Sequence, residues 1–253
     1  MFGISDVGCV RQNNEDRFCV DQQLGLCLLA DGMGGHGHGE VAAGLAVDVS
    51  HHFMAASKDR FDVTWPFGYD YNRTLDENRL MNAIQLANRQ IWSAIKERPE
   101  CAGMGSTLIA VTVDADRLVV GSVGDSRVYL LRNCQMRQIS VDDSFVGDLV
   151  RTGALTEHAA RSHPRRNVLT QAVGANRDLD VHTCEQLLFD GDTLLLATDG
   201  IYGVVEPSTI RSILYSYSNV KTAAEQLVAA VREAGAPDNA SCIVLRYGNE
   251  ERV

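Results

Sequence analysis

Apolar residues gather in stretches of strand length along much of this chain. Runs rich in Leu, Ile and Val occur at 18–30, 106–113, 117–123, 127–131, 193–198 and 241–247. Several runs are joined by very short links, such as Asp114-Ala115-Asp116. Links this short connect antiparallel strands, because parallel strands need a crossover of a dozen residues or more. The pattern therefore predicts antiparallel sheets built largely from consecutive strands.

Helical periodicity appears between these runs. From Leu80 to Ile95, apolar residues recur at spacings of three and four, and Thr74 with Glu77 has the spacing of a capping box just ahead. Further helices are expected at the ranges 41–56, 210–217 and 223–234. Strands joined as hairpins and mixed with helices indicate an α+β fold. We expect two packed antiparallel β-sheets flanked by helices, a four-layer αββα sandwich.

No linker, low-complexity tract or long charged run divides the 253 residues. We therefore expect a single domain over residues 1–250. The segment from about 142 to 178 is polar and has only short helical patterns, such as the one at 145–150. Because long connections are uncommon inside compact domains, we interpret it as an inserted flap that folds over something. An ordinary long connection is the alternative.

Charge and cysteine content restrict the partners and the compartment. The formal net charge is −10, which argues against nucleic acid, and no apolar run approaches the roughly 20 residues of a membrane span. The seven cysteines form no Cys-x-x-Cys pair, and the residues 1–6 show no secretory signal. We expect a cytoplasmic protein. Three arginines at 161, 165 and 166 form a local basic group, either an anion site or a solvated loop face.

Aspartates lie beside apolar runs at four places far apart in the sequence. Asp31, Asp125 and Asp199 each follow such a run, and Asp238 precedes one. One Asp-Gly pair is only a common turn, but four carboxylates at strand ends can converge. Two carboxylates about 4 Å apart repel by roughly 4 kcal/mol at an effective dielectric near 20, so a convergent group needs protons or cations.

Oxygen ligands without cysteine favour Mg²⁺ or Mn²⁺ over Zn²⁺. Two such ions about 3.5–4 Å apart can share and activate a water for hydrolysis of a phosphoryl group. Gly32 leaves its backbone carbonyl accessible as a further ligand. Arg11 suits a phosphate because its planar guanidinium donates two parallel hydrogen bonds, and Glu15 and Asp16 could support metal-bound water. A polar turn leading into the next strand is the simpler alternative for residues 11–17.

Together these residues resemble the ordered motifs of the metal-dependent protein serine/threonine phosphatases, the protein phosphatase 2C family in its bacterial form. The matching stretches are 11–17, Ala30-Asp31-Gly32-Met33-Gly34-Gly35-His36, Gly103-Met104-Gly105-Ser106-Thr107, Val123-Gly124-Asp125-Ser126-Arg127, Ala197-Thr198-Asp199-Gly200 and Pro237-Asp238-Asn239. Residues 163–170 resemble the flap segment of that family. The resemblance extends from about residue 5 to residue 247.

The resemblance implies two core Mn²⁺ or Mg²⁺ ions and a weaker third site. Its metal residues are Asp16, which acts mostly through water, Asp31, which bridges the core ions, the Gly32 carbonyl, Asp125 at the third site, Asp199 and Asp238. The catalytic residues it implies are Arg11, Asp31 and Asp199, and Arg11 binds the substrate phosphate.

Three features depart from the family pattern. Met33 stands where animal members carry a histidine thought to be the general acid, and His36 three residues later is interpreted as a loop histidine. The flap begins Asp142-Asp143-Ser144, where Asp-His-Ser is frequent. The aromatic stretch from Trp65 to Asp76 matches no motif, and we interpret it as a packed loop.

We therefore expect a metal-dependent phosphatase that removes phosphate from serine and threonine in proteins by attack of a water activated by two metal ions. Its expected partners are phosphorylated proteins, including a cognate protein kinase, with no nucleic acid and no membrane, and the chain is expected to be a monomer. A non-catalytic metal-binding module that recognises phosphoproteins is one alternative. A phosphatase of small phosphoesters is another, because the same metal core would serve it.

Overall fold

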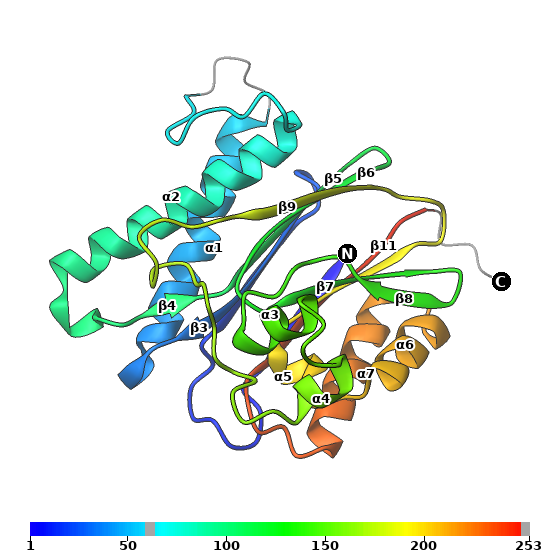
Figure 1. Cartoon of the computed structure of the whole chain (residues 1–253). Coiled ribbons are helices and arrows are strands. Elements are labelled where there is room, and N and C mark those ends of the chain that lie inside the picture. The colour runs from blue at the N-terminus through cyan, green and yellow to red at the C-terminus, as the bar shows by residue number, and fades with distance from the viewer. Residues whose placement is uncertain (59–63, 249–253) are drawn as a thin grey trace.

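Two antiparallel β-sheets lie face to face in the computed structural model, which describes residues 1–58 and 64–248 (Figure 1). The first sheet has the order β1 (Phe2–Asp6), β11 (Ala240–Arg246), β10 (Thr193–Ala197), β7 (Arg127–Arg132) and β8 (Gln135–Gln138). The second has the order β2 (Asp16–Asp21), β3 (Leu26–Met33), β5 (Leu108–Asp114), β6 (Arg117–Val123) and β9 (His182–Leu187), and β4 (Gly105–Ser106) pairs with β3.

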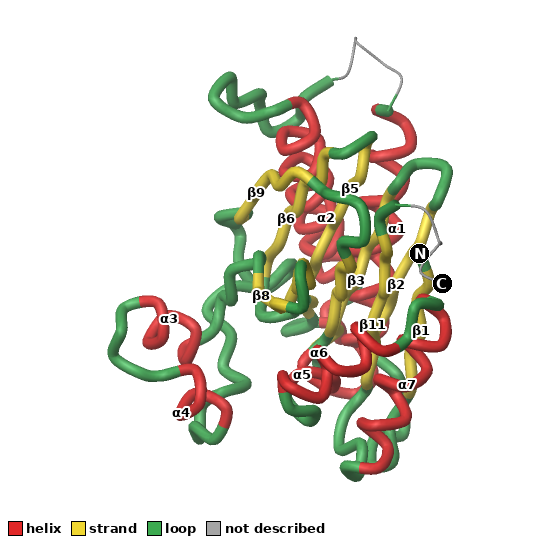
Figure 2. The backbone as a smooth tube through the Cα atoms, turned by 90° about the vertical axis from the view of Figure 1, so that its right-hand side faces the viewer, coloured by secondary structure: helices red, strands yellow, loops and turns green. Residues whose placement is uncertain are grey.

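Helices cover the outer face of each sheet (Figures 1 and 2). The second sheet packs against α1 (His38–Ser57) and α2 (Leu75–Glu97), and the first against α5 (Asp199–Tyr202), α6 (Pro207–Ser216) and α7 (Val220–Glu233). Two short 3-10 helices, η1 (Gly35–Gly37) and η2 (Pro99–Cys101), precede α1 and follow α2. The predicted α+β fold of two antiparallel sheets between helices is confirmed.

Strand alternation produces three separate hydrophobic layers. In β3, Leu26 and Leu28 pack toward α1 and α2, whereas Cys27 and Leu29 pack into the layer between the sheets. Such alternation requires a strand that is apolar on both faces, which explains why β3 is a continuous apolar run in the sequence. The central layer takes side chains from both sheets, including Leu194 of β10.

The start of α2 follows the expected capping pattern. The Thr74 hydroxyl accepts a hydrogen bond from the Glu77 amide at 3.3 Å, and the Glu77 carboxylate accepts one from the Thr74 amide at 2.8 Å. Two buried asparagines of α2, Asn78 and Asn82, hold the preceding loop through hydrogen bonds to its backbone. None of the helices in the described part of the chain is long and apolar enough to cross a membrane.

Residues 142–178 form a separate lobe beside the sandwich, which contains α3 (Phe145–Arg151) and α4 (Glu157–Arg161) (Figure 2). Two isolated β-bridges tie this lobe to itself and to the sheets, Ser144 with Leu169 and Ser106 with Val173. The lobe therefore leaves the sheets after β8 and returns to them beside β4, at the end where the acidic residues gather.

Candidate metal and phosphate site

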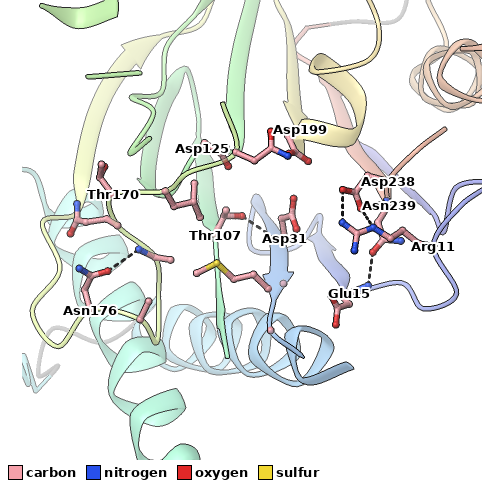
Figure 3. Close-up of a pocket in the computed structure, with 18 residues that line it drawn as sticks. Arg11, Glu15, Asp31, Thr107, Asp125, Thr170, Asn176, Asp199, Asp238 and Asn239 are labelled. Carbon is pink, nitrogen blue, oxygen red and sulfur yellow. Dashed lines mark hydrogen bonds and ion pairs between the residues drawn. The ribbon is translucent and has the colours of Figure 1, made fainter. Parts of the chain in front are cut away.

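Five aspartates from separate elements meet at one end of the two sheets, and Figure 3 shows four of them, Asp31, Asp125, Asp199 and Asp238. Asp16 of β2 stands opposite Asp31 of β3 in the strand register. Asp125 lies in the turn between β6 and β7, Asp199 begins α5 directly after β10, and Asp238 precedes β11. The fold therefore brings together carboxylates that are up to 222 residues apart in the sequence.

A pocket of about 430 Å³ opens above this group. Its wall on the side of the sheets includes Arg11, Glu15, Asp31, Gly32, Asp125, Asp199 and Asp238. The opposite wall comes from the lobe, with Asn167, Leu169, Thr170, Gln171, Ala172, Ala175 and Asn176. Two surfaces of different chemistry thus face each other, one acidic and one free of acidic side chains.

The expectation that Asp31 ends a strand at a turn is wrong. Strand β3 continues to Met33, because Gly32 and Met33 pair with Ser106 and Gly105 of β4. The Asp31 amide also donates a hydrogen bond to the Thr107 hydroxyl at 2.9 Å. Asp31 is therefore held in a rigid strand and not in a flexible turn, which fixes its carboxylate more firmly than the sequence indicates.

Two glycines allow the strands to approach each other closely around the site. A Cβ atom on Gly32 would lie 2.2 Å from the Gly39 carbonyl oxygen, and one on Gly200 would lie 1.8 Å from the Asn239 carbonyl oxygen. A side chain at Gly32 would force β3 away from the start of α1, and one at Gly200 would force the turn that carries Asp199 away from the turn that carries Asp238. Close backbone approach is thus a second reason for glycine here, besides access to its carbonyl.

The carboxylates raise one another's pKa. Removal from water and then repulsion by Asp16 and Asp199 raise the pKa of Asp31 well above its ordinary value. Removal from water, followed by repulsion from other carboxylates, raises the pKa of Asp16 to about 7 and that of Asp125 to about 8. The pKa of Asp199 is also raised by removal from water and by Asp238, although a hydrogen bond with Asp31 opposes the effect. Without cations, these carboxylates keep their protons up to a higher pH than ordinary carboxylates do, and bound cations would take the place of those protons.

Asp16 provides the most direct sign that a positive group belongs here. Its Oδ2 atom accepts a hydrogen bond from the Thr198 hydroxyl at 3.1 Å, but its buried Oδ1 atom has no hydrogen-bond partner among the residues that the structure describes. A buried carboxylate oxygen without a partner costs free energy, since it has lost water and gained nothing. A cation, directly or through its water, would satisfy this oxygen.

The donor set matches hard divalent cations. The candidate ligands are aspartate and glutamate side chains, and no cysteine or histidine among the described side chains lines the pocket. In the described part of the chain, no three His, Cys, Asp or Glu side chains lie close enough to hold an ion by themselves. Mg²⁺ and Mn²⁺ suit such an open arrangement, because Mg²⁺ usually keeps several waters and binds one or two carboxylates.

Arg11 lies at the edge of this acidic wall. Its Nε and Nη2 atoms each lie 2.8 Å from an oxygen of Asp238, and 52% of its side chain is exposed. The hydrogen bond with Asp238 raises the pKa of Arg11 further. The guanidinium is therefore fixed near the candidate ligands and still faces the pocket, as a phosphate-binding group must.

Asn239 was missed by the sequence analysis as a positioning residue. Its buried side-chain oxygen accepts a hydrogen bond from the Glu15 amide at 2.9 Å (Figure 3). Its side-chain nitrogen donates to the carbonyls of Val7 and Asn13, both at 2.9 Å. Asn239 thus clamps both ends of the loop that carries Arg11. Its position next to Asp238 in a family motif is the only sequence signal for this role.

A group of buried hydroxyls supports the backbone that carries the acidic side chains. The sequence did not predict this role either. The Thr107 hydroxyl contacts the Ser126 hydroxyl at 2.8 Å as well as the Asp31 amide, and the Thr198 hydroxyl accepts from the Ser241 amide at 3.1 Å. These contacts fix the strands under the carboxylates. Ser and Thr are so common in turns that the sequence alone gave them no distinct role.

The three residues that begin the lobe make contacts within the fold. Asp142 pairs with Arg127 at 2.7 Å, and Asp143 lies 2.8 Å from a ring nitrogen of His182. Ser144 caps α3 by accepting a hydrogen bond from the Gly147 amide. The departure from the Asp-His-Ser pattern therefore falls on residues that anchor the lobe and not on the pocket wall.

Met33, His36 and the aromatic stretch are the other departures from the family pattern. Met33 lines the pocket, so a thioether occupies the position of the animal histidine. The side chain of His36 lies outside the described part of the structure. In the aromatic stretch, Trp65 and Tyr71 each pack edge to face against Tyr69, while 90% of Tyr71 is exposed. Of the wider range 58–76, residues 59–63 lie outside the described residues.

The fold and the site define a phosphatase of the protein phosphatase 2C class, and comparison with known proteins agrees. Residues 10–237 match the family model described as protein phosphatase 2C. This chain belongs to that family. It is 32% identical over 249 residues to the serine/threonine phosphatase stp of Listeria innocua serovar 6a, covering 95% of this chain and 93% of the relative.

Solved structures show the same architecture. The serine/threonine phosphatase PstP/Ppp of Mycobacterium tuberculosis superposes with a TM-score of 0.84 at 33% identity, covering 98% of each chain. The catalytic domain of the phosphatase PstP, solved with two manganese ions, superposes with a TM-score of 0.82 at 31% identity, covering 98% of this chain and 97% of that chain. Phosphatases of this class use Mn²⁺ or Mg²⁺, as expected from the donor set.

Proposed function

We propose that the acidic pocket hydrolyses phosphoserine and phosphothreonine in proteins, as the class to which this chain belongs does. The observation that carries this assignment is the convergence of Asp31, Asp199 and Asp238 beside the guanidinium of Arg11 (Figure 3). Carboxylates bind cations and a guanidinium binds a phosphate, so the pocket can bring the two parts of the reaction together.

The metal ligands we propose are Asp31, which would be shared by two ions, Asp199 and Asp238, which would hold one of them, and the Gly32 carbonyl, which would hold the other. Asp16 would support the ions through water, and Asp125 with Asp199 would hold a weaker third ion. The orphaned buried oxygen of Asp16 and the raised pKa of Asp31 support this assignment. When bound, the ions supply an activated water and offset the negative charge of the phosphoryl group.

The role we propose for Arg11 is to bind and orient the substrate phosphate. Arg11 is charged throughout the physiological range and is held 2.8 Å from Asp238, so its fork has a fixed direction. A phosphate that enters the pocket can accept hydrogen bonds from the exposed face of the guanidinium. The backbone of the 7–15 loop, held by Asn239, keeps that face turned toward the pocket.

We propose that residues 1–250 act as one catalytic domain in which 142–178 form the flap. Its partners would be Ser/Thr-phosphorylated proteins, including a cognate protein kinase, and the chain would act as a monomer. A cytoplasmic location is supported by the cysteines, since all seven are free and three of them are buried in apolar layers.

The test is phosphate release with Mn²⁺ from a phosphothreonine peptide, the matching phosphotyrosine peptide and glucose 6-phosphate. We expect turnover of the phosphothreonine peptide to be the fastest by at least an order of magnitude, and to stop when EDTA is added. Faster hydrolysis of the sugar phosphate would favour a phosphatase of small phosphoesters. Binding of the phosphothreonine peptide without turnover would instead indicate a recognition module.

A further inference from the structure

The lobe presents a short segment, residues 168–171, along the pocket, directly after the turn at 164–167. One edge of this segment pairs with residues 143–145: the Phe145 amide donates to the Val168 carbonyl at 2.8 Å, and the Thr170 amide donates to the Asp143 carbonyl at 2.9 Å. Ser144 and Leu169 are the bridged pair between these two bonds. In an antiparallel pair of this kind, the N–H and C=O of the central residue point away from the partner strand. Those of Leu169 therefore point outward.

The outward edge is available to a ligand. Within the described residues, the amides of Leu169 and Gln171 and the carbonyl of Leu169 make no hydrogen bond. Both residues line the pocket, as do Asn167 and Thr170. Figure 3 shows Thr170 on the far side of the pocket from Arg11, with Asp31 between them. An accessible edge with unpaired backbone groups is a template for adding a strand.

The charge around this edge suits an anionic chain. Residues 161–177 carry four arginines and no acidic residue, in a protein whose net charge is −10. Arg165 lies over the ring of Phe145 at 5.1 Å, and neither Arg165 nor Arg166 forms an ion pair within the described part of the chain. An acidic protein repels a phosphopeptide at long range. Arg165 and Arg166 are exposed and lie next to the pocket-lining Asn167, so they would reduce that repulsion locally, whereas Arg161 is already paired with Glu206.

We infer that the substrate binds as an extended strand along the edge of residues 168–171, by main-chain hydrogen bonds to Leu169 and Gln171. This inference rests on the proposed protein phosphatase activity and adds the conformation that the substrate takes. The ligand is a phosphoserine or phosphothreonine peptide segment without fixed structure, whose phosphorylated side chain points across the pocket to Arg11. Arg165 and Arg166 at the end of the edge would attract acidic side chains that flank the phosphorylated residue.

Main-chain pairing has a signature that side-chain recognition lacks. A strand alternates, so every second peptide amide points toward the edge and the intervening amides point away. A methyl group on a peptide nitrogen that points toward the edge removes one hydrogen bond and adds bulk. The same methyl group on the neighbouring nitrogen points elsewhere and changes little.

The experiment is a scan of N-methylated phosphothreonine peptides, one methylated amide at a time over three residues on each side, with the unmodified enzyme and Mn²⁺. We expect kcat/KM to fall by about tenfold at alternate positions and to change less than about twofold between them, because one hydrogen bond is worth about that factor. A flat profile, or a loss that does not alternate, would overturn the proposal. No hydrolysis of either the parent peptide or p-nitrophenyl phosphate would instead overturn the proposed function.

A variant of the protein provides a second measurement. Leu169→Pro removes the outward N–H and leaves both hydrogen bonds to residues 143–145 in place, and proline is tolerated on strand edges. We expect the ratio of kcat/KM for the phosphopeptide to that for p-nitrophenyl phosphate to fall about tenfold. The control is Glu157→Pro, which introduces proline at the first position of α4, where it is accepted. An unchanged ratio in a folded Leu169→Pro variant would refute strand addition.

Discussion

Arg11 and Asp238 form an ion pair at the rim of a pocket whose interior is strongly acidic. The pair is half-exposed, with 52% of the Arg11 side chain and 33% of the Asp238 side chain accessible. Exposed ion pairs contribute little stability, so this pair costs little to rearrange. A phosphate and a metal ion could therefore take over the two partners, the phosphate at Arg11 and the ion at Asp238.

Replacing Arg11 tests its role as the phosphate clamp. We expect Arg11→Ala to raise KM for a phosphothreonine peptide by about tenfold or more, the value of a charge-assisted hydrogen bond, with a smaller fall in kcat. Arg117→Ala, in the hairpin at the opposite end of the sheets, is the control and should leave both constants unchanged. Steady-state kinetics at saturating Mn²⁺ measures the effect, and an unchanged KM would reject the clamp.

Replacing a carboxylate that is proposed to bind one or both metal ions tests the assignment of the metal ligands. Asp31→Asn or Asp199→Asn removes a charged ligand and should lower Mn²⁺-dependent turnover by about 10³-fold or more, since metal stabilisation of the transition state is worth several kcal/mol. Asp114→Asn, on an exposed hairpin, should retain full activity. Turnover like that of the unchanged protein in either site variant would show that the ligand assignment is wrong.

The sequence shows the charged residues of the site more readily than the polar residues that hold them in place. A single aspartate beside a buried strand is an ordinary turn residue, but four of them at the ends of separate apolar runs are conspicuous. Thr107 and Asn239 are equally well placed, but each looks like an ordinary turn residue, and their hydrogen bonds reach partners 76 and 224 residues away. Only the folded chain shows which small polar side chains meet the site.

Among the elements, the 7–15 loop is held by several contacts, which include a hydrogen bond from the Cys9 amide to the Ala236 carbonyl and the ion pair of Arg11 with Asp238. Asn239, which is buried, adds three hydrogen bonds to this loop. We expect Asn239→Ala to cost about 1–3 kcal/mol of unfolding free energy and also to raise KM for the phosphopeptide, because the loop carries Arg11. Asn72→Ala, at an exposed site, should change neither. Thermal unfolding and kinetics measured together would separate a merely structural role, which would lower stability without changing KM.

Element prediction from the sequence succeeded where burial was greatest. The predicted strands at 117–123, 127–131 and 193–198 agree closely with β6, β7 and β10, and the helix predicted from Leu80 is part of α2. The edge strands β1, β8 and β9 were not predicted, because half-exposed strands need less apolar sequence. Strand β4 has only two residues, and α4 and α5 are one turn long or little more, too short for a periodic signal.

At the scale of the whole molecule, the acidic pocket opposes folding unless cations are bound. The pKa of Asp16 is raised from 3.8 to about 7, and that of Asp125 to about 8. Between the ordinary pKa of 3.8 and these raised values, the folded state binds more protons than the unfolded state. The free energy of unfolding therefore falls as the pH rises through this window. A cation that replaces the protons relieves the effect at high pH.

This linkage predicts how stability responds to pH and metal. The Tm of the metal-free protein should fall between pH 5 and pH 8, and Mn²⁺ should raise Tm more at pH 8 than at pH 5. Differential scanning fluorimetry with and without EDTA measures both trends. Asp125→Asn should reduce the fall, because it removes one of the groups that must lose a proton. A larger effect of Mn²⁺ at pH 5 would contradict the account.

The central claim is that Asp31, Asp199 and Asp238 share a pair of divalent ions in the pocket faced by Arg11. The most direct measurement is anomalous diffraction at the manganese absorption edge from crystals grown with Mn²⁺. The account predicts two strong peaks about 3.5–4 Å apart, with Asp31 touching both. Manganese peaks elsewhere in the molecule, or none within reach of these three carboxylates, would contradict it.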